Sequence, residues 1–339
     1  MTKHLLYRNL YHWFERNHRT LPWRETTNPY HIWVSEIILQ QTRVAQGLEY
    51  YLRFIHRFPS VEDLAQAEED EVLLYWQGLG YYSRARNLHK GAKLLAHKPF
   101  PDTFEQLRTI PGVGDYTAGA IASFAYNLPH PALDGNVYRV LSRLFDCDIP
   151  FDTTLGKHTF HQLAEDLLDR SQPRLFNTAI MEFGALFCTP QTPDCRQCPL
   201  QTFCKAFANN TVDLLPVRKP RPTLKNRYLR YTIYLEKSNN NLLTCRTLIH
   251  QRTKKDIWHH LWEFPLEESN TPFNSGLTLT HTLSHQRLHA TFVLQPVETL
   301  PTIPDTRTIR LGDLQDYALP RLILRALEQI LPALAQNPF

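Results

Sequence analysis

Four of the six cysteines in this chain fall within one short, proline-flanked stretch, and no other feature constrains the fold as strongly. Their spacing is Cys188-x6-Cys195-x2-Cys198-x5-Cys204. Structural zinc sites usually use two short Cys-x-x-Cys or Cys/His pairs a dozen or more residues apart, whereas this stretch has one such pair with a single cysteine on each side. Four soft thiolates also suit iron and sulfide. We therefore predict a [4Fe–4S] cluster, with zinc or a disulfide pair as the alternatives.

The remaining sequence predicts a cytoplasmic protein. The first residues show no basic segment followed by an apolar run and a cleavage site, and nowhere do about 18 apolar residues follow one another. A reducing compartment explains why clustered cysteines would bind a metal instead of forming disulfides. Cys147 and Cys245 stand alone, and we expect them to be small buried apolar residues.

The chain of 339 residues is too long for one hydrophobic core, so we predict two domains. Helical periodicity dominates residues 1–205 and predicts an all-α domain. Residues 206–227 lose this periodicity, gain prolines and basic residues, and are predicted to be a connector. Residues 228–339 contain β-branched and aromatic segments and a final helical segment, a pattern that predicts an α+β domain.

Net charge alone does not indicate a nucleic-acid partner, because the formal charge of +4 arises entirely after residue 220. Local basic clusters are more informative. One contains Arg84, Arg86, Lys90, Lys93 and Lys98, and the other contains Arg218, Lys219, Arg221, Lys225, Arg227 and Arg230. Each could be a solvated surface, but we favour contact with a nucleic-acid backbone. The first cluster follows Gly78-Leu79-Gly80-Tyr81-Tyr82, and aromatic side chains beside basic ones suit insertion into a base stack.

The run Pro111-Gly112-Val113-Gly114 lies between two apolar segments and predicts a tight hairpin between two helices. Glycines at Gly112 and Gly114 leave the backbone N–H groups open to a phosphate, and the N-terminus of the second helix adds a partial positive charge. Such a contact positions DNA without reading its sequence. A plain turn is the alternative for a lone Gly-x-Gly.

Two carboxyl groups are candidates for acid chemistry. Glu36 has almost only apolar neighbours, and burial raises the pKa of a carboxyl group toward the range of a general acid. Asp134 opens the run Asp134-Gly135-Asn136-Val137. Cleavage of a glycosidic bond needs one carboxyl to protonate the leaving group and another, ionised, against the cationic sugar. Taken singly, Glu36 could lie on an exposed helix stripe and Asp134 in a turn.

Together these motifs resemble, along the whole chain, the MutY-type adenine DNA glycosylases of the helix–hairpin–helix (endonuclease III) superfamily. The resemblance rests on the ordered segments Leu21-Pro22-Trp23-Arg24, Ser35-Glu36-Ile37-Ile38-Leu39-Gln40-Gln41-Thr42, Gly78-Leu79-Gly80-Tyr81-Tyr82, Pro111-Gly112-Val113-Gly114, Leu133-Asp134-Gly135-Asn136-Val137 and the four-cysteine run. It implies excision, from double-stranded DNA, of adenine mispaired with 8-oxoguanine or guanine. We expect a monomer, with no membrane partner, that is nucleoid-associated if bacterial.

The resemblance also implies roles for individual residues. Glu36 would protonate adenine N7, and Asp134, helped by Asn136 and Tyr116, would stabilise the oxocarbenium ion or bond transiently to C1′. The target nucleotide must first leave the base stack. Trp23 and Arg24 match residues that line the adenine pocket, while Gln41 and Tyr81 match residues that enter the stack near the lesion.

Tyr116 separates this sequence from the related enzymes that also cut the DNA strand. Those enzymes carry a lysine nucleophile at this place, and a phenol cannot form a Schiff base. A monofunctional glycosylase is therefore expected.

The C-terminal domain resembles the lesion-recognition domain of the same family, a Nudix-like fold. The matching segments are Trp258-His259-His260-Leu261-Trp262-Glu263-Phe264-Pro265 and Thr282-Leu283-Ser284-His285, of which Ser284 and His285 are expected to contact the lesion. The acidic Nudix box is missing, which argues against pyrophosphate hydrolysis. Two residues depart from the family pattern: Leu283 replaces the usual Phe, and Thr178 replaces a Gln or Glu that contacts adenine.

Two other classes of protein share part of this pattern. A non-catalytic iron–sulfur DNA-binding module would need neither Glu36 nor Asp134, and an electron-transfer protein would not need the hairpin. The presence of both carboxyl groups and the hairpin favours the glycosylase.

Overall fold

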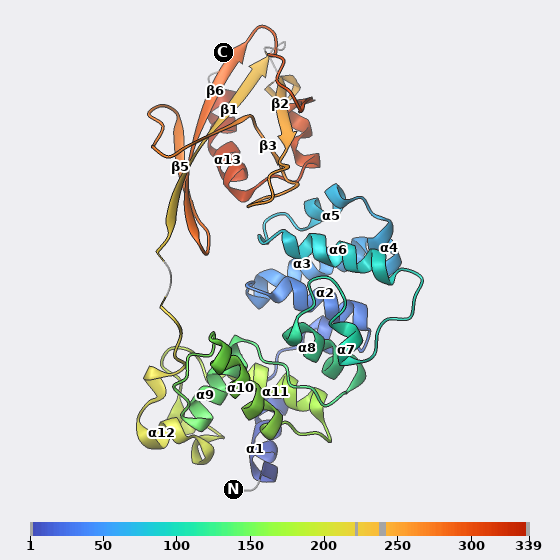
Figure 1. Ribbon diagram of the computed structural model, residues 1–339, viewed down its shortest axis with the longest axis vertical. Helices are drawn as coiled ribbons and strands as arrows, with labels where there is room; N and C mark the ends of the chain where they lie inside the picture. Colours follow the sequence, from blue (N-terminus) through green and yellow to red (C-terminus); the bar gives the residue numbers. More distant parts are fainter. Residues whose placement is uncertain (1–2, 221–222, 237–241, 337–339) are drawn as a thin grey trace. The chain divides into compact units, whose positions relative to one another are not determined.

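The computed structural model describes residues 3–220, 223–236 and 242–336 (Figure 1). By their internal contacts the residues form two compact units. The first comprises Met1–His56, Ser60–Glu62 and Lys90–Pro220, and the second comprises Arg57–Pro59, Asp63–His89 and Arg221–Phe339. Arg221 of the predicted basic connector lies outside the described residues.

The chain before the sheet is helical, as predicted. Its α-helices are α1 (Lys3–Asn17), α2 (Pro29–Leu39), α3 (Val44–Arg57), α4 (Val61–Gln66), α5 (Glu69–Tyr75), α6 (Ser83–Leu95), α7 (Phe104–Leu107), α8 (Asp115–Tyr126), α9 (Gly135–Phe145), α10 (Thr154–Leu167), α11 (Pro173–Leu186) and α12 (Lys205–Asn209). Short 3-10 turns are η1 (Pro22–Arg24), η2 (Cys195–Gln197), η3 (Gln201–Phe203) and η4 (Val212–Leu214). Several helices begin at a residue whose side chain satisfies free backbone N–H groups, as Asn28 does for α2.

Apolar side chains of α1, α9, α10 and α11 form one core of the first unit. Leu10 of α1 and Phe160 of α10 are fully buried there, and Trp13 meets Phe183 edge-on at a centroid distance of 5.1 Å. Helix α2 is buried along nearly its whole length, from Tyr30 to Ile38. A polar side chain on that helix must therefore find its partners inside the protein.

The predicted hairpin lies between α7 and α8. Gly112 has a φ of 79°, a left-handed conformation that glycine adopts without strain. Val113 is buried and donates its backbone N–H to the carbonyl of Ile110 at 3.0 Å. Gly114 is the N-cap of α8, and a Cβ there would meet no atom within 4 Å. At Gly112 and Gly114 the turn therefore leaves its backbone uncovered by side chains, next to the N-terminus of α8.

A mixed sheet and one long helix form the C-terminal part (Figure 1). Its strands are β1 (Lys225–Glu236), β2 (Arg246–Gln251), β3 (Trp262–Glu263), β4 (Leu266–Ser269), β5 (Leu277–Thr282), β6 (Gln286–Val297) and β7 (Thr306–Arg310), with 3-10 turns η5 (Leu242–Thr244) and η6 (Leu311–Asp316) and helix α13 (Arg321–Gln336). The main strand order is β3-β2-β1-β6-β5, while β4 pairs with β1 and β7 pairs with β2. Strands β1 and β6 run parallel, and the other pairs are antiparallel.

The core of this part lies between the sheet and α13. Tyr231 of β1 and Phe292 of β6 stack with ring centroids 5.2 Å apart, and the apolar side chains of α13, such as Leu322 and Ile323, are buried in the same cluster. Alternate side chains of β1 and β6 point into this core, which accounts for the alternating apolar pattern of these segments in the sequence. The predicted α+β architecture is therefore confirmed.

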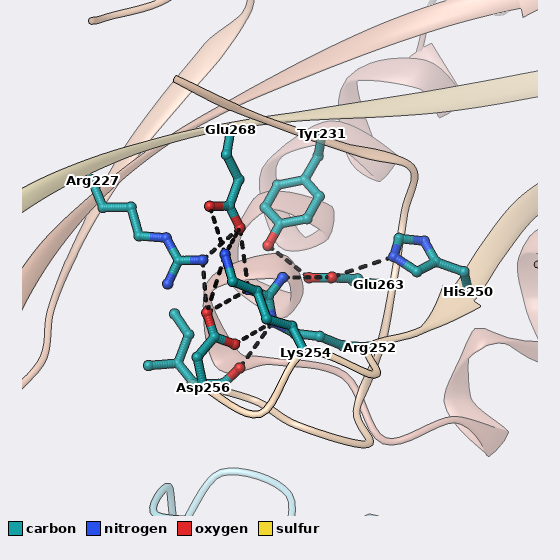
Figure 2. Close-up of polar contacts among 9 residues, drawn as sticks. Arg227, Tyr231, His250, Arg252, Lys254, Asp256, Glu263 and Glu268 are labelled. Carbon is teal, nitrogen blue, oxygen red and sulfur yellow. Dashed lines mark hydrogen bonds and ion pairs between the residues drawn. The ribbon is translucent and has the colours of Figure 1, made fainter. Parts of the chain in front are cut away.

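A network of charged side chains joins β1, β2, β3 and β4 (Figure 2). Arg252 is 4% exposed and donates to Glu263 at 2.8 Å and to both carboxylate oxygens of Asp256. The Tyr231 hydroxyl donates to the other oxygen of Glu263 at 3.0 Å. Glu268 completes the network through ion pairs with Arg252 and neighbouring cations. Buried charges are tolerated here because each has a hydrogen-bonded partner of opposite sign.

Candidate active site

Glu36 lies on α2 with its side chain almost fully enclosed, since the residue is 5% exposed. The hydroxyl of Tyr116, on α8, donates to Glu36 Oε2 at 2.6 Å. Burial raises the pKa of Glu36 to about 7; the Tyr116 hydrogen bond and the charge of Arg24 oppose the rise, whereas the charge of Asp134 adds to it. A carboxyl group with this pKa holds its proton near neutral pH and can donate it to a leaving group.

The raised pKa makes Glu36 a source of instability at high pH. Below its ordinary pKa of 4.5 the folded and unfolded chains both bind the proton, but above it the unfolded chain releases the proton while the folded chain retains it up to about pH 7. Folding is therefore penalised progressively between these values. We expect Glu36→Gln to be more stable than the wild type by about 1–3 kcal/mol at pH 8, with a smaller difference at pH 5.

Urea unfolding of both proteins at the two pH values measures this difference. Glu15→Gln, an exposed residue of α1, is the control for loss of a carboxylate without burial. A stability difference between Glu36→Gln and the wild type that is independent of pH would contradict the assignment of a proton-retaining Glu36.

Asp134 occupies a different environment at the N-terminus of α9. Its Oδ1 accepts the backbone N–H groups of Asn136 at 2.9 Å and Val137 at 2.8 Å, and its Oδ2 accepts the side-chain amide of Asn136 at 2.7 Å. Burial raises the pKa of Asp134, but these hydrogen bonds oppose the rise. Together with the positive end of the helix dipole they favour a carboxylate. Asp134, for which a plain turn was the alternative, is thus a helix N-cap with its carboxyl group held in a fixed orientation.

Tyr116 and Asn136 each contact one of the two carboxyl groups. Burial raises the pKa of Tyr116 well above its ordinary value, and the charges of Glu36 and Asp134 raise it further. The phenol therefore stays protonated and can only donate toward Glu36. Asn136 is oriented by Arg139, whose Nη2 donates to Asn136 Oδ1 at 2.9 Å. The structure brings together the four predicted catalytic residues.

Arg139 also connects this site to the cysteine stretch, a role that the sequence did not indicate. Its side chain is buried and donates to the carbonyl of Gly184 at 2.6 Å and to that of Cys188 at 2.7 Å. One guanidinium thus joins Asn136 to the first cysteine. An Arg one turn after Asn136 on an amphipathic helix is ordinarily read as a surface residue, so only the fold reveals this link.

The sequence analysis also missed Glu182 and Arg19, which form a cluster with Arg24. Glu182 on α11 is fully buried and binds both Arg24 and Arg19. The available signal was the acid itself, which lies in the apolar segment Ile180-Met181-Glu182-Phe183, much as Glu36 lies in α2. Trp23, the other predicted pocket residue, is buried and meets Tyr51 edge-on at 5.2 Å.

The residues predicted to enter the base stack share an unusual backbone. Gln41 has a φ of 62° and Tyr81 a φ of 47°, both left-handed, and the Tyr81 side chain is 51% exposed. Arg84 lies over the Tyr81 ring at 5.5 Å and donates to the carbonyls of Leu79 and Gly80. Strained backbone of this kind persists only where surrounding contacts fix it, and it is common in functional loops.

Thr178, which replaces the expected Gln or Glu, uses its hydroxyl within its own helix. The Oγ1 atom donates to the Arg174 carbonyl at 2.8 Å. The Thr178 hydroxyl is therefore engaged within its helix. The Thr side chain is also much shorter than that of Gln or Glu. Any contact of α11 with a base at this position would differ from that expected for Gln or Glu.

The four predicted cysteine ligands line one cavity. Its other walls are mostly apolar and include Phe183, Phe187 and Leu200. Burial raises the pKa of the Cys198 thiol to about 12. A metal binds the thiolate, so the positive charge of the metal must stabilise this buried anion. Within the described residues, no group of three or more His, Cys, Asp or Glu side chains is placed to hold a single metal ion. Four thiols around one cavity form a donor set that an iron–sulfur cluster accepts.

Arg143 joins the start of the cysteine stretch to a segment that follows it. Its buried guanidinium donates to Cys188 Sγ at 3.4 Å, to the Thr189 carbonyl at 2.7 Å and to the Leu215 carbonyl at 3.2 Å. Cys147 and Cys245, predicted to be buried apolar residues, are half-buried and buried respectively, and neither lines the cavity.

Ser284 and His285 form the exposed turn between β5 and β6. The backbone N–H of Leu283 donates to the Gln286 carbonyl at 2.8 Å and closes this turn, while the Leu283 side chain packs against the core of the sheet. The Ser284 hydroxyl lies 3.3 Å from Nδ1 of His285. The polar side chains of Ser284 and His285 are therefore exposed in a turn whose remaining residue, Leu283, packs against the core.

Comparison with known proteins identifies relatives of both parts of the chain. Residues 34–154 match the model of the HhH-GPD superfamily base excision DNA repair proteins, and residues 242–329 match that of the NUDIX domain. An adenine DNA glycosylase of Buchnera aphidicola (subsp. Baizongia pistaciae) is 32% identical over 312 residues, which cover 88% of this chain and 86% of the relative. The adenine DNA glycosylase of Mus musculus is 42% identical over 64% of this chain but only 44% of its own length.

Two solved structures share the helical fold. A thermostable thymine-DNA glycosylase superposes with a TM-score of 0.56 at 25% identity, covering 61% of this chain and 97% of that protein. Endonuclease III in a non-covalent complex with DNA gives a TM-score of 0.52 at 22% identity, covering 62% and 98%. The family matches and this fold confirm the predicted architecture, a helix–hairpin–helix domain followed by a Nudix-like domain. None of the helices in the described ranges combines the length and apolar character that a membrane span requires.

Proposed function

Because this chain belongs to the family of adenine DNA glycosylases, which hydrolyse N-glycosidic bonds, we propose that it excises adenine paired with 8-oxoguanine, or with guanine, in double-stranded DNA. The family's reaction is the removal of adenine in base excision repair. The observation that carries the proposed mechanism is the pair of unlike carboxyl groups. Glu36 is buried and retains its proton, whereas three hydrogen-bond donors favour the ionised form of Asp134.

In the proposed reaction, the target nucleotide first leaves the stack and enters the site. Glu36 donates its proton to N7 of adenine, so that the C1′–N9 bond can break with its electron pair on the departing base. The deoxyribose is left with positive charge at C1′. Asp134, oriented by Asn136, stabilises this charge or bonds transiently to C1′ before water adds there and loses its proton.

We also propose that the enzyme leaves the DNA strand intact. Tyr116 occupies the place where strand-cutting relatives would carry an amine, and its phenol is fixed as a donor to Glu36. Without an amine no Schiff base with the opened sugar can form.

Cys188, Cys195, Cys198 and Cys204 would hold a [4Fe–4S] cluster. When bound, the cluster would supply a covalent clamp for the loop, not chemistry at the sugar. The loop carries Arg196 and is followed by Lys205, and both cations suit a DNA backbone. We expect the hairpin backbone at Gly112, Val113 and Gly114 to contact phosphates as well.

Further DNA contacts are proposed for four residues. Trp23 and Arg24 would border the adenine pocket, and Gln41 and Tyr81 would enter the base stack. We expect the enzyme to act as a monomer in the cytoplasm, at the nucleoid if the source is bacterial.

The direct test is incubation of the purified protein with duplexes that contain adenine opposite 8-oxoguanine, guanine or thymine. We expect an alkali-labile site at the adenine, formed fastest opposite 8-oxoguanine and not opposite thymine. No strand break should precede the alkali treatment, and borohydride should trap no adduct. Binding without any alkali-labile product would instead indicate a non-catalytic DNA-binding protein.

Recognition of 8-oxoguanine is assigned to the exposed turn at Ser284 and His285. We expect the double change Ser284→Ala and His285→Ala to reduce the preference for 8-oxoguanine over guanine by roughly tenfold to a hundredfold, because loss of polar readout of a base typically costs ~1–3 kcal/mol. The measurement is the single-turnover excision rate on both duplexes at one salt concentration.

Thr308→Ala, an exposed change on β7, is the matched control and should leave the preference unchanged. If the double variant retains the full preference while Thr308→Ala behaves like the wild type, the lesion is read elsewhere.

A further inference from the structure

Glu182 is a fully buried carboxylate that the proposed reaction does not use. It lies on α11, where its neighbours along the sequence are apolar. Its Oε1 accepts the backbone N–H of Arg19 at 2.9 Å and the Nε of Arg19 at 2.8 Å. Its Oε2 accepts Nη2 of Arg19 at 2.6 Å and Nη2 of Arg24 at 2.7 Å. A single carboxylate thus holds two guanidinium groups.

This arrangement keeps Glu182 ionised. Burial alone would raise its pKa, but the hydrogen bonds from Arg19 and Arg24 outweigh burial and lower the pKa to about 2. The Glu182, Arg19 and Arg24 side chains therefore carry a net charge of +1 at neutral pH. Removal of the carboxylate would leave two partly buried guanidinium groups without their counter-charge, which is unfavourable.

Contacts from α11 also fix the backbone around Arg24. Nη2 of Arg174 donates to the carbonyls of Arg24 at 3.1 Å and Thr26 at 2.9 Å. Arg24 in turn donates to the Arg19 carbonyl at 3.4 Å. The position of the Arg24 guanidinium is accordingly set by α11 and by the residues before η1, not by solvent.

Among the members of this cluster, Arg24 is the one whose charge acts on Glu36. The charged and titratable groups that act on Glu36 are Tyr116 from α8, Asp134 at the start of α9 and Arg24 in η1. Arg24 favours the ionised form of Glu36, and the carboxylate of Glu182 partly cancels the Arg24 charge. The net charge of Glu182, Arg19 and Arg24 therefore influences the protonation of Glu36.

We propose that Glu182 is a positioning residue for adenine excision, which holds the Arg24 guanidinium in place and offsets its charge. This inference rests on the proposed role of Glu36 as the acid. Glu182 itself is not expected to touch the substrate. A purely structural clamp would affect folding and the maximal rate but would not move the pH profile.

Two substitutions change the net charge of this cluster in opposite directions. Glu182→Gln raises it from +1 to +2, which favours ionised Glu36, so the loss of activity with rising pH should begin about half a pH unit lower or more. Arg19→Gln lowers it to zero while leaving the Arg24 pair, so the same loss should begin at higher pH. For Glu182→Gln we also expect the maximal rate to fall on the order of tenfold, because Arg24 is no longer held in place.

The measurement is the single-turnover excision rate of each full-length variant from pH 5 to pH 9, with thermal unfolding recorded in parallel. Glu182→Asp keeps the charge and should retain a profile close to that of the wild type. Glu263→Gln is the matched control, because Glu263 is equally buried and paired with an arginine in the C-terminal sheet. It should lower stability without moving the profile.

Opposite displacement of the profiles of Glu182→Gln and Arg19→Gln supports the inference. Unmoved profiles, or displacement of both in one direction, would overturn it, and if Glu182→Gln does not fold, an unmoved Arg19→Gln profile does so alone. Glu36→Gln separates the two levels of the argument. If that variant retains wild-type rates, the acid has been misassigned; if it is inactive and the other profiles are unmoved, only the role of Glu182 is wrong.

Discussion

Glu36→Gln is expected to slow adenine release by ~10²–10⁴-fold, because the reaction loses protonation of the leaving base. In this structure the substitution should remove the acidic group and change little else. Glutamine is close in size to glutamate and can still accept the hydrogen bond from Tyr116, so the surrounding packing should persist. Binding of the mismatched duplex should stay within a few-fold of wild type, because the hairpin and the turn at Tyr81 are untouched.

Single-turnover excision under saturating enzyme isolates the chemical step from product release. The exposed Glu15→Gln serves as the control, as in the stability measurement. Excision by Glu36→Gln at a rate close to that of the wild type would remove Glu36 from the mechanism. Loss of both excision and binding would instead point to a disrupted fold, which circular dichroism would reveal.

Cys198→Ser is expected to abolish the bound iron and weaken DNA binding by at least about tenfold at low salt. Cys198 lines the cavity together with the other three cysteines, and burial raises the pKa of its thiol to about 12. A serine hydroxyl is a poor ligand for iron, so the cluster would lose one of its four attachments. The loop would then rely on hydrogen bonds from Arg143 and on the packing of Leu200 and Phe203.

Iron content and visible absorbance of the purified protein measure the cluster, and a salt titration of DNA binding measures its consequence. Cys147→Ser is the matched control, since Cys147 is half-buried but does not line the cavity. That variant should keep its iron. Stoichiometric zinc without iron in the wild-type protein would show that the ligand spacing was misinterpreted.

Local sequence predicted the features that depend on short stretches of chain. The turn at Gly112 follows from glycine's access to positive φ, and the burial of Glu36 follows from its apolar neighbours on α2. Strands β1 and β6 were legible from β-branched and aromatic residues, but their parallel pairing was not, because it joins segments far apart in the chain. The cysteine spacing likewise indicated a shared site, while the cavity required the fold.

Interactions between distant segments escaped prediction for the same reason. Glu182 meets Arg19 across 163 residues of sequence, and nothing near either residue indicates its partner. Arg139 was unrecognised because an arginine on an amphipathic helix is normally exposed. Buried ion pairs of this kind are visible only once packing is known. The proposed reacting groups were therefore predictable from local sequence, whereas the residues that orient them became visible only in the folded structure.

The left-handed backbone at Gln41 and Tyr81 has a consequence for how these positions can evolve. A non-glycine residue with positive φ costs roughly 1–2 kcal/mol, and glycine or asparagine adopts that conformation more readily. Drift toward glycine or asparagine would therefore be favoured unless the side chains themselves are needed. Retention of Gln or Tyr at these positions among relatives would be evidence of selection on the side chain against the preference of the backbone.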